Sequence, residues 1–509
     1  ETDEKNKLNF EIFLTKQFKK KVASRCPIVF KVPFQNENFT GRHQYLVNLR
    51  SALNEEGFCS ICSCLVGMKG IGKSQIAKAY AYNLDENGDI LYDAGYDLVW
   101  WFNASLSLEL QFKDLCEVWN QQLPFWNENL SDVEQFTKIS IEDEPENYIE
   151  HMKQFLRRTT KSWLLIFDNA SSYEGIKKYM PYKGTTIQGK HIIATSKNSL
   201  EWNNPLELTV FDPKESVQLL ERTTKRGDEK GALSLARELK HYPLAIAQAG
   251  AYLIQHPSLR YEDYQKYFLT RRQKLWEIEE KLKSTGRSVL GYDEYEFTFK
   301  AAFELNLDEI SNHYPLALNM FKYCAFLHHT AIPEILLRNL VKQEGGDPDF
   351  DFDEAISWLI RYSIMQLDVT FHSAKKGLER RSMLIQTYSF HELLQIVLRD
   401  TLSSETTKEK LTKLEPILAS QLQFVRRDQE AWLLSQRLTP HAKVFLEYVE
   451  KASLPHSSSI RTIKVNTQAS YIDKFIAIKK EQRENKEAQD LDESELKKKI
   501  ESESLFAFG

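Results

Sequence analysis

The sequence predicts an α/β domain with a mostly parallel sheet, followed by a helical domain, a winged-helix domain and a helical C-terminal region. Three observations lead to this prediction. Glycine and proline are scarce, at 19 and 15 of 509 residues, which argues against all-β and repetitive architectures. From about residue 58 to 215, short apolar runs alternate with amphipathic stretches, as strands alternate with helices. Beyond residue 215 helical periodicity dominates until two β-like runs before residue 391.

Composition and charge exclude several classes of protein. A hydrophobic fraction of 42% and a net charge of -5 argue against a mainly disordered chain and against bulk attraction to nucleic acid or anionic membranes. No stretch reaches the roughly 18 apolar residues of a membrane span. The charged N-terminus has no initiating Met and no signal-peptide core, so we expect a fragment or a processed product. The expected compartment is the cytoplasm, or the host cytosol if the chain is a secreted bacterial effector.

The predicted strands are the apolar runs at residues 59–67, 97–104, 162–170 and 191–196. After the first run, residues 74–84 have helical periodicity, while the acidic stretch 141–146 is predicted to be a surface insertion. The first run also holds three cysteines, Cys59, Cys62 and Cys64. No second cysteine or histidine pair follows at zinc spacing, so we interpret them as small, buried strand residues.

The helical part divides into further domains. The predicted boundaries are an N-terminal tail or effector remnant at 1–35, the α/β domain at 36–213, a helical domain at 214–283, a winged helix at 284–405 and a charged helical region at 406–509. The winged helix is predicted because helices are followed by the β-like runs 364–371 and 382–390, which a polar, basic segment joins. Residues 476–503 are rich in Lys and Glu, which is typical of a solvated helix or a frayed tail.

The strongest motif follows the first strand. Residues 67–74, Gly-Met-Lys-Gly-Ile-Gly-Lys-Ser, fit the pattern GxxxxGK[ST] between a predicted strand and a predicted helix. Glycines let the backbone N–H groups of such a loop surround a phosphate chain, and the helix N-terminus adds a positive dipole. Lys73 is expected to bridge the terminal phosphates, and the Ser74 hydroxyl is expected to bind Mg²⁺. The alternative is a glycine-rich turn without a ligand.

A second acidic ligand is predicted at the end of a neighbouring strand. The run Trp163–Phe167 ends at Asp168, which we assign to Mg²⁺ through water. Many such ATPases have a second acid next, but this chain has Asn169. Because an amide cannot act as a base, hydrolysis is expected to be slow or absent. Lys73, Asp168 and Asn169 are therefore the candidate catalytic residues.

In its order of motifs the chain resembles the STAND-class P-loop ATPases of the NB-ARC type, over about residues 36–445. These include plant disease-resistance proteins, apoptotic protease-activating factors and bacterial tetratricopeptide regulators. NENFTGRHQYLVNL resembles the family's entry segment, GMKGIGKSQIA its phosphate loop, LLIFDNA its Mg²⁺ strand and HIIATSKN its sensor segment. LKHYPLAI resembles its GxP segment, and Phe390-His391-Glu392 stands where the family has Met-His-Asp. QRLTPH, at 436–441, resembles its lead-in to tetratricopeptide repeats.

The resemblance implies a nucleotide site made of residues from several segments. Lys197 replaces the sensor arginine and keeps its charge without its planar fork. His391 is implied to bind the β-phosphate of ADP. The implied nucleotide-binding residues are Phe39, Thr40, Arg42, Gly67, Met68, Lys69, Gly70, Ile71, Gly72, Lys73, Ser74, Gln75, Lys197, Pro243, Leu244 and His391.

The implied function is a switch with a closed ADP state, an open ATP state and slow hydrolysis, using ADP or ATP with Mg²⁺. Its expected partners are the adenine nucleotide and other proteins, with self-association on activation. One alternative is a hydrolysis-deficient scaffold that keeps its nucleotide, which Asn169 and Lys197 favour; another is a conventional P-loop enzyme such as a kinase. The basic segment, with Lys375, Lys376, Arg380 and Arg381, raises the question of DNA. A solvated hairpin tip is the commoner explanation, so we expect no nucleic-acid partner.

Overall fold

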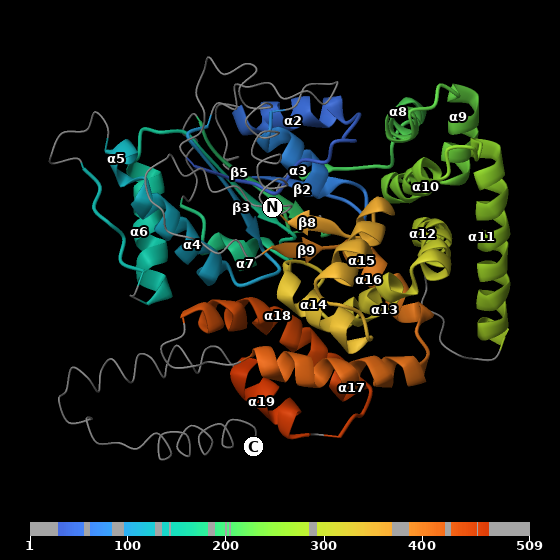
Figure 1. Cartoon of the computed structure of the whole chain (residues 1–509). Helices are drawn as coiled ribbons and strands as arrows, with labels where there is room; N and C mark the ends of the chain where they lie inside the picture. Colours follow the sequence, from blue (N-terminus) through green and yellow to red (C-terminus); the bar gives the residue numbers. More distant parts are fainter. Residues whose placement is uncertain are drawn as a thin grey trace. The chain divides into compact units, whose positions relative to one another are not determined.

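A computed structural model describes most of the chain (Figure 1). It describes residues 29–54, 62–83, 96–127, 135–141, 144–181, 189–198, 201–202, 205–284, 293–368, 386–422, 429–455 and 457–467. These residues form two compact units. The larger unit runs to Ala325 and continues from His329 to Thr401, and the smaller unit comprises Phe326–His328 and the residues from Leu402 onward.

The larger unit begins with a six-stranded parallel sheet, which confirms the predicted fold class. The strands are β1 (Val29–Lys31), β2 (Cys62–Val66), β3 (Leu98–Asn103), β4 (Trp163–Asp168), β5 (Lys190–Ser196) and β6 (Leu206–Glu207). Their order is β1-β3-β4-β5-β2-β6, and all neighbours are parallel. The four longer strands correspond to the four predicted runs. The sequence did not indicate β1 and β6, because strands of three and two residues are too short to show a pattern.

Helices cover both faces of this sheet (Figure 1). They are α2 (His43–Asn54), α3 (Lys73–Ala81), α4 (Leu108–Gln121), α5 (Leu123–Trp126), α6 (Pro145–Arg158) and α7 (Tyr173–Lys177). Strands buried on both faces are apolar throughout, which explains why β3 and β4 appear in the sequence as continuous runs. On the face of α4 and α6, the Phe102 ring stacks between Phe112 and Phe167, with centroids 4.7 and 4.8 Å away.

The structure describes only part of the predicted surface insertion at 141–146 and of the cysteine-rich first strand. Residues 142–143 and Cys59 lie outside the described residues. Pro145 and Glu146 are on the surface, but they form the first turn of α6 instead of an insertion, because proline suits the first position of a helix. Cys64 is buried in β2 with 2% of its surface exposed.

Four helices follow the sheet: α8 (Pro213–Thr224), α9 (Glu229–Glu238), α10 (Pro243–Gln255) and α11 (Tyr261–Ser284). Asp212 and Glu215 form a capping box at the start of α8. Helix α10 packs between α8 and α12, so nearly its whole circumference is buried and apolar.

The last part of the larger unit contains α12 (Glu294–His313), α13 (Pro315–Cys324), β7 (Ile332–Pro333), α14 (Glu334–Gln343), α15 (Phe350–Arg361), β8 (Gln366–Asp368), β9 (Thr387–Ser389) and α16 (Glu392–Thr401). The three strands form an antiparallel sheet in the order β7-β9-β8. From α13 to β9 the order is helix, strand, helix, helix, strand, strand. The predicted basic segment between β8 and β9 lies outside the described residues.

The smaller unit is helical among its described residues, with α17 (Ser404–Gln421), α18 (Gln429–Lys451) and α19 (Ser458–Thr467) packed on one another. The Lys- and Glu-rich stretch 476–503 lies outside the described residues. Across the described part of both units, no helix combines the length and apolar character that a membrane crossing requires.

Candidate nucleotide-binding site

The phosphate loop lies between the end of β2 and the start of α3, as predicted from its motif. Its glycines have positive φ angles, which residues with a side chain rarely adopt. Gly70 has φ +71°, and a Cβ atom placed there would lie 2.9 Å from Cδ2 of Leu244. Gly72 has φ +105° immediately before Lys73, the first residue of α3. A side chain at either position would strain the loop.

Replacing Gly70 with alanine is expected to weaken nucleotide binding about tenfold, because left-handed backbone costs an L-residue roughly 1–2 kcal/mol and the new methyl group meets α10. Titration calorimetry with ATP measures the loss. Gly227→Ala is the control, since a Cβ there meets nothing within 4 Å. Equal affinities of the two variants would contradict the prediction.

Lys73 lies folded over the loop. Its Nζ donates to the backbone carbonyls of Gly67 and Met68, at 2.8 and 2.9 Å. Burial lowers the pKa of Lys73 to about 8, against the opposing charge of Asp168. The ammonium group therefore stays mostly charged at neutral pH, where it can exchange these carbonyls for phosphate oxygens.

Three oxygen-bearing side chains meet beside Lys73. Oδ1 of Asp168 accepts hydrogen bonds from the Ser74 hydroxyl at 2.7 Å and from the Thr195 hydroxyl at 2.6 Å. The parallel register brings the ends of β4 and β5 to the same edge of the sheet as the loop. Thr195 also accepts from the backbone N–H of Asn169, which has φ +62°. Sequence reasoning missed Thr195, since a threonine near a strand end is common.

The entry segment connects the loop to α8 through Arg42. Phe39, Thr40 and Arg42 are all buried. The guanidinium of Arg42 donates to the carbonyls of Ile71 at 3.1 Å and Thr209 at 2.8 Å, and it lies over the Phe211 ring at 4.5 Å. Its backbone N–H donates to the Glu215 carboxylate in the capping box of α8. The Arg42 side chain therefore joins three segments of the larger unit.

The GxP segment meets the loop from the other side. Pro243 is the first residue of α10 and is buried, and Leu244 is half-buried beside Gly70. The Tyr242 hydroxyl donates to the backbone carbonyl of Lys69. Tyr242 was not predicted, because no local pattern indicates a contact across 173 residues.

The start of α16 contributes charge to the same place. The Glu392 carboxylate pairs with Lys197, which follows β5, and with Lys69 of the phosphate loop, whose Nζ lies 3.4 Å away. Burial opposes ionisation of Glu392, but the hydrogen bond and charge of Lys197 prevail and lower its pKa to about 2. The sequence identified Lys197 and His391 as candidates but did not predict the ion pairs of Glu392.

His391 is half-buried next to these charges. Its Nδ1 accepts the backbone N–H of Leu393 at 3.1 Å. Burial lowers the pKa of His391 to about 4, and the nearby cations Lys73, Lys197 and Lys69 lower it further, against Glu392. The imidazole is therefore neutral at pH 7, with its proton on Nε2 because Nδ1 is an acceptor.

This pKa shift predicts a pH-dependent stability. Between pH 6.5 and 4 the unfolded chain binds a proton at residue 391 that the folded chain does not, so stability present above pH 6.5 is lost as the pH falls towards 4. From pH 7 to pH 5 we expect nucleotide-free protein to lose about 2 kcal/mol more stability than His391→Asn does. Urea unfolding at both pH values measures the difference, and equal losses would contradict it.

Contacts further from the loop also join the two sheets of the larger unit. The Asn103 amide, at the end of β3, donates to the Thr330 hydroxyl at 3.0 Å. Within the antiparallel sheet, Asp368 of β8 accepts from the Ser389 hydroxyl of β9, and burial raises the pKa of Asp368 to about 6. At the phosphate loop itself, Lys69 contacts both Tyr242, which precedes α10, and Glu392, which begins α16.

Comparisons with known proteins give distant relatives. No known family model matches the chain. It is 28% identical over 257 residues to a curated protein of Hyaloscypha variabilis named nucleotide-binding leucine-rich repeat (NLR)-like protein. The match covers 45% of this chain and 23% of that protein, so the chain spans about a quarter of the length of this curated relative.

Similar solved structures are more distant in sequence. A signal transduction ATPase with numerous domains (STAND) and a tetratricopeptide repeat sensor, from Pyrococcus horikoshii, has a TM-score of 0.47 and 12% identity, over 88% of this chain and 55% of that one. The ORC2 protein of Aeropyrum pernix has a TM-score of 0.27 and 13% identity, over 72% and 97%. Cdc6p of Pyrobaculum aerophilum has a TM-score of 0.27 and 11% identity, over 74% and 100%.

Proposed function

Because the chain resembles STAND-class P-loop ATPases of the NB-ARC type, as its NLR-like relative supports, we propose that it is a nucleotide-dependent switch. One observation carries the proposal. The Glu392 carboxylate at the start of α16 forms ion pairs with Lys69 of the phosphate loop and with Lys197 after β5. A switch requires a site at which a second segment, here the start of α16, contacts the phosphate loop and can respond to the nucleotide bound there.

The phosphate chain of ADP or ATP is proposed to lie along residues 67–72, with Lys73 donating to its oxygens. The Ser74 hydroxyl and the Asp168 carboxylate are hard oxygen donors already 2.7 Å apart, so they suit Mg²⁺. When bound, Mg²⁺ would neutralise phosphate charge and fix the phosphate geometry. Thr195 holds Asp168 in place from the neighbouring strand.

The adenine is proposed to lie against the entry segment and the start of α10, at Phe39, Thr40, Pro243 and Leu244. Tyr242 and Arg42 support this arrangement, since each donates a hydrogen bond to a backbone carbonyl of the phosphate loop. The proposed domains of the switch are the α/β domain at 36–213, the helical domain at 214–283, the winged helix at 284–405 and the helical region at 406–509.

In the closed state Glu392 neutralises Lys69 and Lys197, and the Nε2–H of His391 is free to face the β-phosphate of ADP. The terminal phosphate of ATP would compete with Glu392 for the same two lysines. A ligand shifts such an equilibrium only by its difference in affinity for the two states. Loss of the Glu392 pairs supplies this difference and would release α16 for contact with protein partners or a second copy.

Turnover is proposed to be slow. The position after Asp168 is Asn169, whose amide cannot accept a proton from water, and whose backbone is committed to the hydrogen bond with Thr195. The second candidate function, a scaffold that keeps its nucleotide without hydrolysis, is favoured by this same observation.

Identification of the bound nucleotide tests the proposal. The purified protein is denatured, and the released nucleotide is separated by chromatography and quantified against protein concentration, with the final column buffer as the blank. Stoichiometric ADP supports the closed switch. Stoichiometric ATP supports the scaffold. Absence of nucleotide, together with no binding of added ATP in calorimetry, would overturn both.

A further inference from the structure

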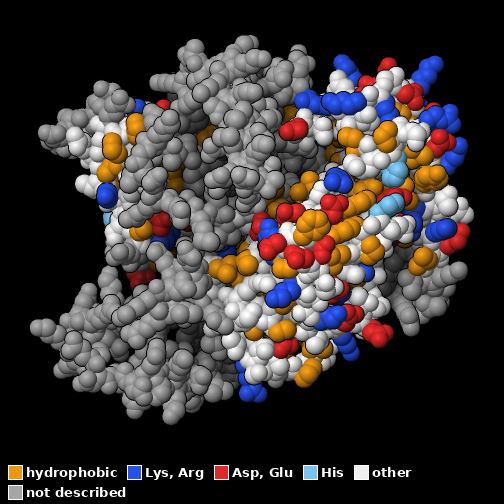
Figure 2. All heavy atoms as spheres, viewed as in Figure 1, with side chains coloured by type: hydrophobic (Ala, Val, Ile, Leu, Met, Phe, Trp, Pro, Cys, Tyr) orange, Lys and Arg blue, Asp and Glu red, His pale blue; other side chains and the backbone are white. Residues whose placement is uncertain are grey.

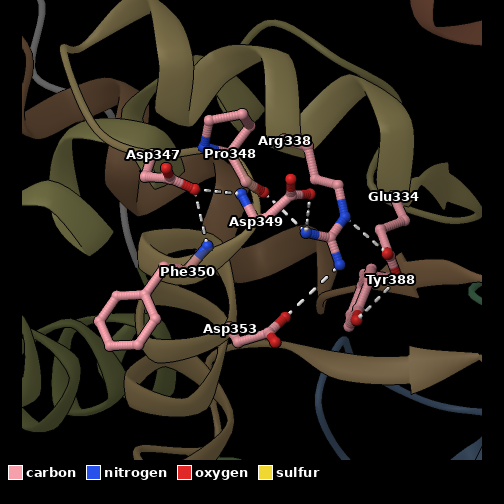
Figure 3. Close-up of polar contacts among 8 residues, drawn as sticks. All are labelled: Glu334, Arg338, Asp347, Pro348, Asp349, Phe350, Asp353 and Tyr388. Carbon is pink, nitrogen blue, oxygen red and sulfur yellow. Dashed lines mark hydrogen bonds and ion pairs between the residues drawn. The ribbon is translucent and has the colours of Figure 1, made fainter. Parts of the chain in front are cut away.

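Phe350 is the most exposed large hydrophobic residue in the described part of the chain. It is the first residue of α15, and 81% of its surface is accessible. Figure 3 shows its ring pointing away from Arg338 and from the rest of the polar cluster. An aromatic ring in contact with water is unfavourable, so burying this ring against a partner would be favourable.

The backbone around Phe350 is fixed by hydrogen bonds. Oδ1 of Asp347 accepts from the backbone N–H groups of Asp349 and Phe350, at 2.8 and 2.9 Å (Figure 3). The Asp351 carboxylate accepts from the backbone N–H of Asp347 at 2.7 Å. These bonds close the turn that leads into α15 and satisfy N–H groups that the helix leaves unpaired.

Arg338 of α14 holds the same turn from the opposite side. Its Nη1 donates to the carbonyl of Pro348 at 2.7 Å, and its Nε donates to Glu334 at 2.7 Å. Its guanidinium lies 4.3 Å from the centroid of the Phe352 ring, and Phe352 is buried. The backbone at Phe350 is therefore held in place, and an aromatic side chain with only two rotatable bonds loses little entropy when it binds.

The surroundings of Phe350 are acidic. We define the Phe350 surface as Phe350 with the exposed residues Asp347, Asp349, Asp353 and Glu354. Arg338 pairs with Asp349 and with Asp353, at 3.5 Å each, but one arginine among these acids leaves the surface with a negative net charge. In Figure 2 acidic and hydrophobic side chains gather over the region where Figure 1 places α14 and α15. Hydrogen bonds from the backbone lower the pKa of Asp347, so it stays ionised. This charge repels phosphate backbones and anionic lipids, which leaves a cationic polypeptide as the suitable partner.

The chain itself contains a segment of this kind. Residues 8–25, LNFEIFLTKQFKKKVASR, carry apolar residues at positions i, i+3, i+4 and i+8, beginning at Phe10. Five cations lie among or after them: Lys16, Lys19, Lys20, Lys21 and Arg25. The segment therefore offers aromatic side chains for Phe350 and positive charge for its acidic rim.

We propose that the Phe350 surface binds residues 8–25 of the same chain, because the covalent connection gives this segment a high effective concentration at the surface. The contact would attach the N-terminal segment to the α14–α15 turn. It requires no nucleotide, so it stands independently of the proposed switch.

Site-specific photo-crosslinking in the full chain tests the contact. Phe350 is replaced by p-benzoylphenylalanine, the protein is irradiated, and crosslinked peptides are identified by mass spectrometry. We expect peptides from residues 8–25 in the monomer band, and a crosslink to these residues in the dimer band alone would contradict binding within one chain. The same replacement at Tyr267, which is 49% exposed on α11, is the control.

A second variant separates specific binding from chance proximity. Asp349→Asn, Asp353→Asn and Glu354→Gln together are expected to reduce the crosslink yield about tenfold, since each exposed charge pair contributes a fraction of a kcal/mol. Glu229→Gln, Glu262→Gln and Glu277→Gln remove the same charge from exposed positions elsewhere and should leave the yield unchanged. Crosslinks only to other segments, no crosslink, or equal yields from both triple variants would overturn the proposal.

Discussion

Lys73→Ala is expected to lower the affinity for ATP and for ADP by at least about 100-fold. Charge-assisted hydrogen bonds are worth roughly 1.5–3 kcal/mol each, and Lys73 is placed to make them with the phosphates. Its two present hydrogen bonds go to the carbonyls of Gly67 and Met68, inside the loop that would hold the phosphate chain. Fluorescence titration with a labelled ATP measures the loss.

The control for this prediction is Lys177→Ala, on the exposed end of α7, which removes the same charge from a surface pair with Glu174. Circular dichroism and thermal unfolding of both variants show whether the fold is kept. A folded Lys73→Ala protein that binds ATP within threefold of wild type would contradict the assignment of the phosphate loop.

Glu392→Gln is expected to raise the ratio of the dissociation constants, ADP over ATP, by about tenfold or more. The carboxylate pairs with both Lys69 and Lys197, and its side chain is only 30% exposed. A neutral amide no longer neutralises the two lysines, so the closed state loses roughly 1–3 kcal/mol. The lysines then remain available for a terminal phosphate. Equilibrium titrations with fluorescent ADP and with fluorescent ATP measure both dissociation constants.

Glu334→Gln is the matched control, because Glu334 forms a partly buried pair with Arg338 in the same part of the fold. It should leave the nucleotide ratio unchanged. A double-mutant cycle with Lys197→Ala then isolates the Lys197–Glu392 interaction. Additive effects of the two substitutions would mean that this ion pair does not couple α16 to the nucleotide.

Much of the fold could be predicted because its signals are local. Strands β3 and β4 are buried on both faces, so each is a nearly continuous apolar run in the sequence. The phosphate loop follows from glycines at fixed offsets, since left-handed backbone angles select glycine residue by residue. By contrast, β1 pairs with β3 over three residues, too few to form a pattern of its own.

The contacts among the candidate site residues were not predicted from the sequence. The resemblance placed Arg42, Lys197 and His391 near a nucleotide, and the structure brings them around the loop. It also shows the Arg42 side chain joining the loop to Thr209, and the Arg42 backbone N–H bonding to Glu215 of α8, contacts that its motif did not indicate. Thr195, Tyr242 and the ion pairs of Glu392 were not foreseen at all.

By itself, then, the sequence determined the parallel sheet, the phosphate loop and its acidic neighbour Asp168. Each depends on burial or backbone geometry that a few adjacent residues specify. Only the tertiary structure decided that Glu392 pairs with Lys69 and Lys197, and that Tyr242 donates to the loop. The residues next to a charged group or a hydroxyl in the sequence do not indicate its partner, because these partners meet only when segments more than 170 residues apart pack together.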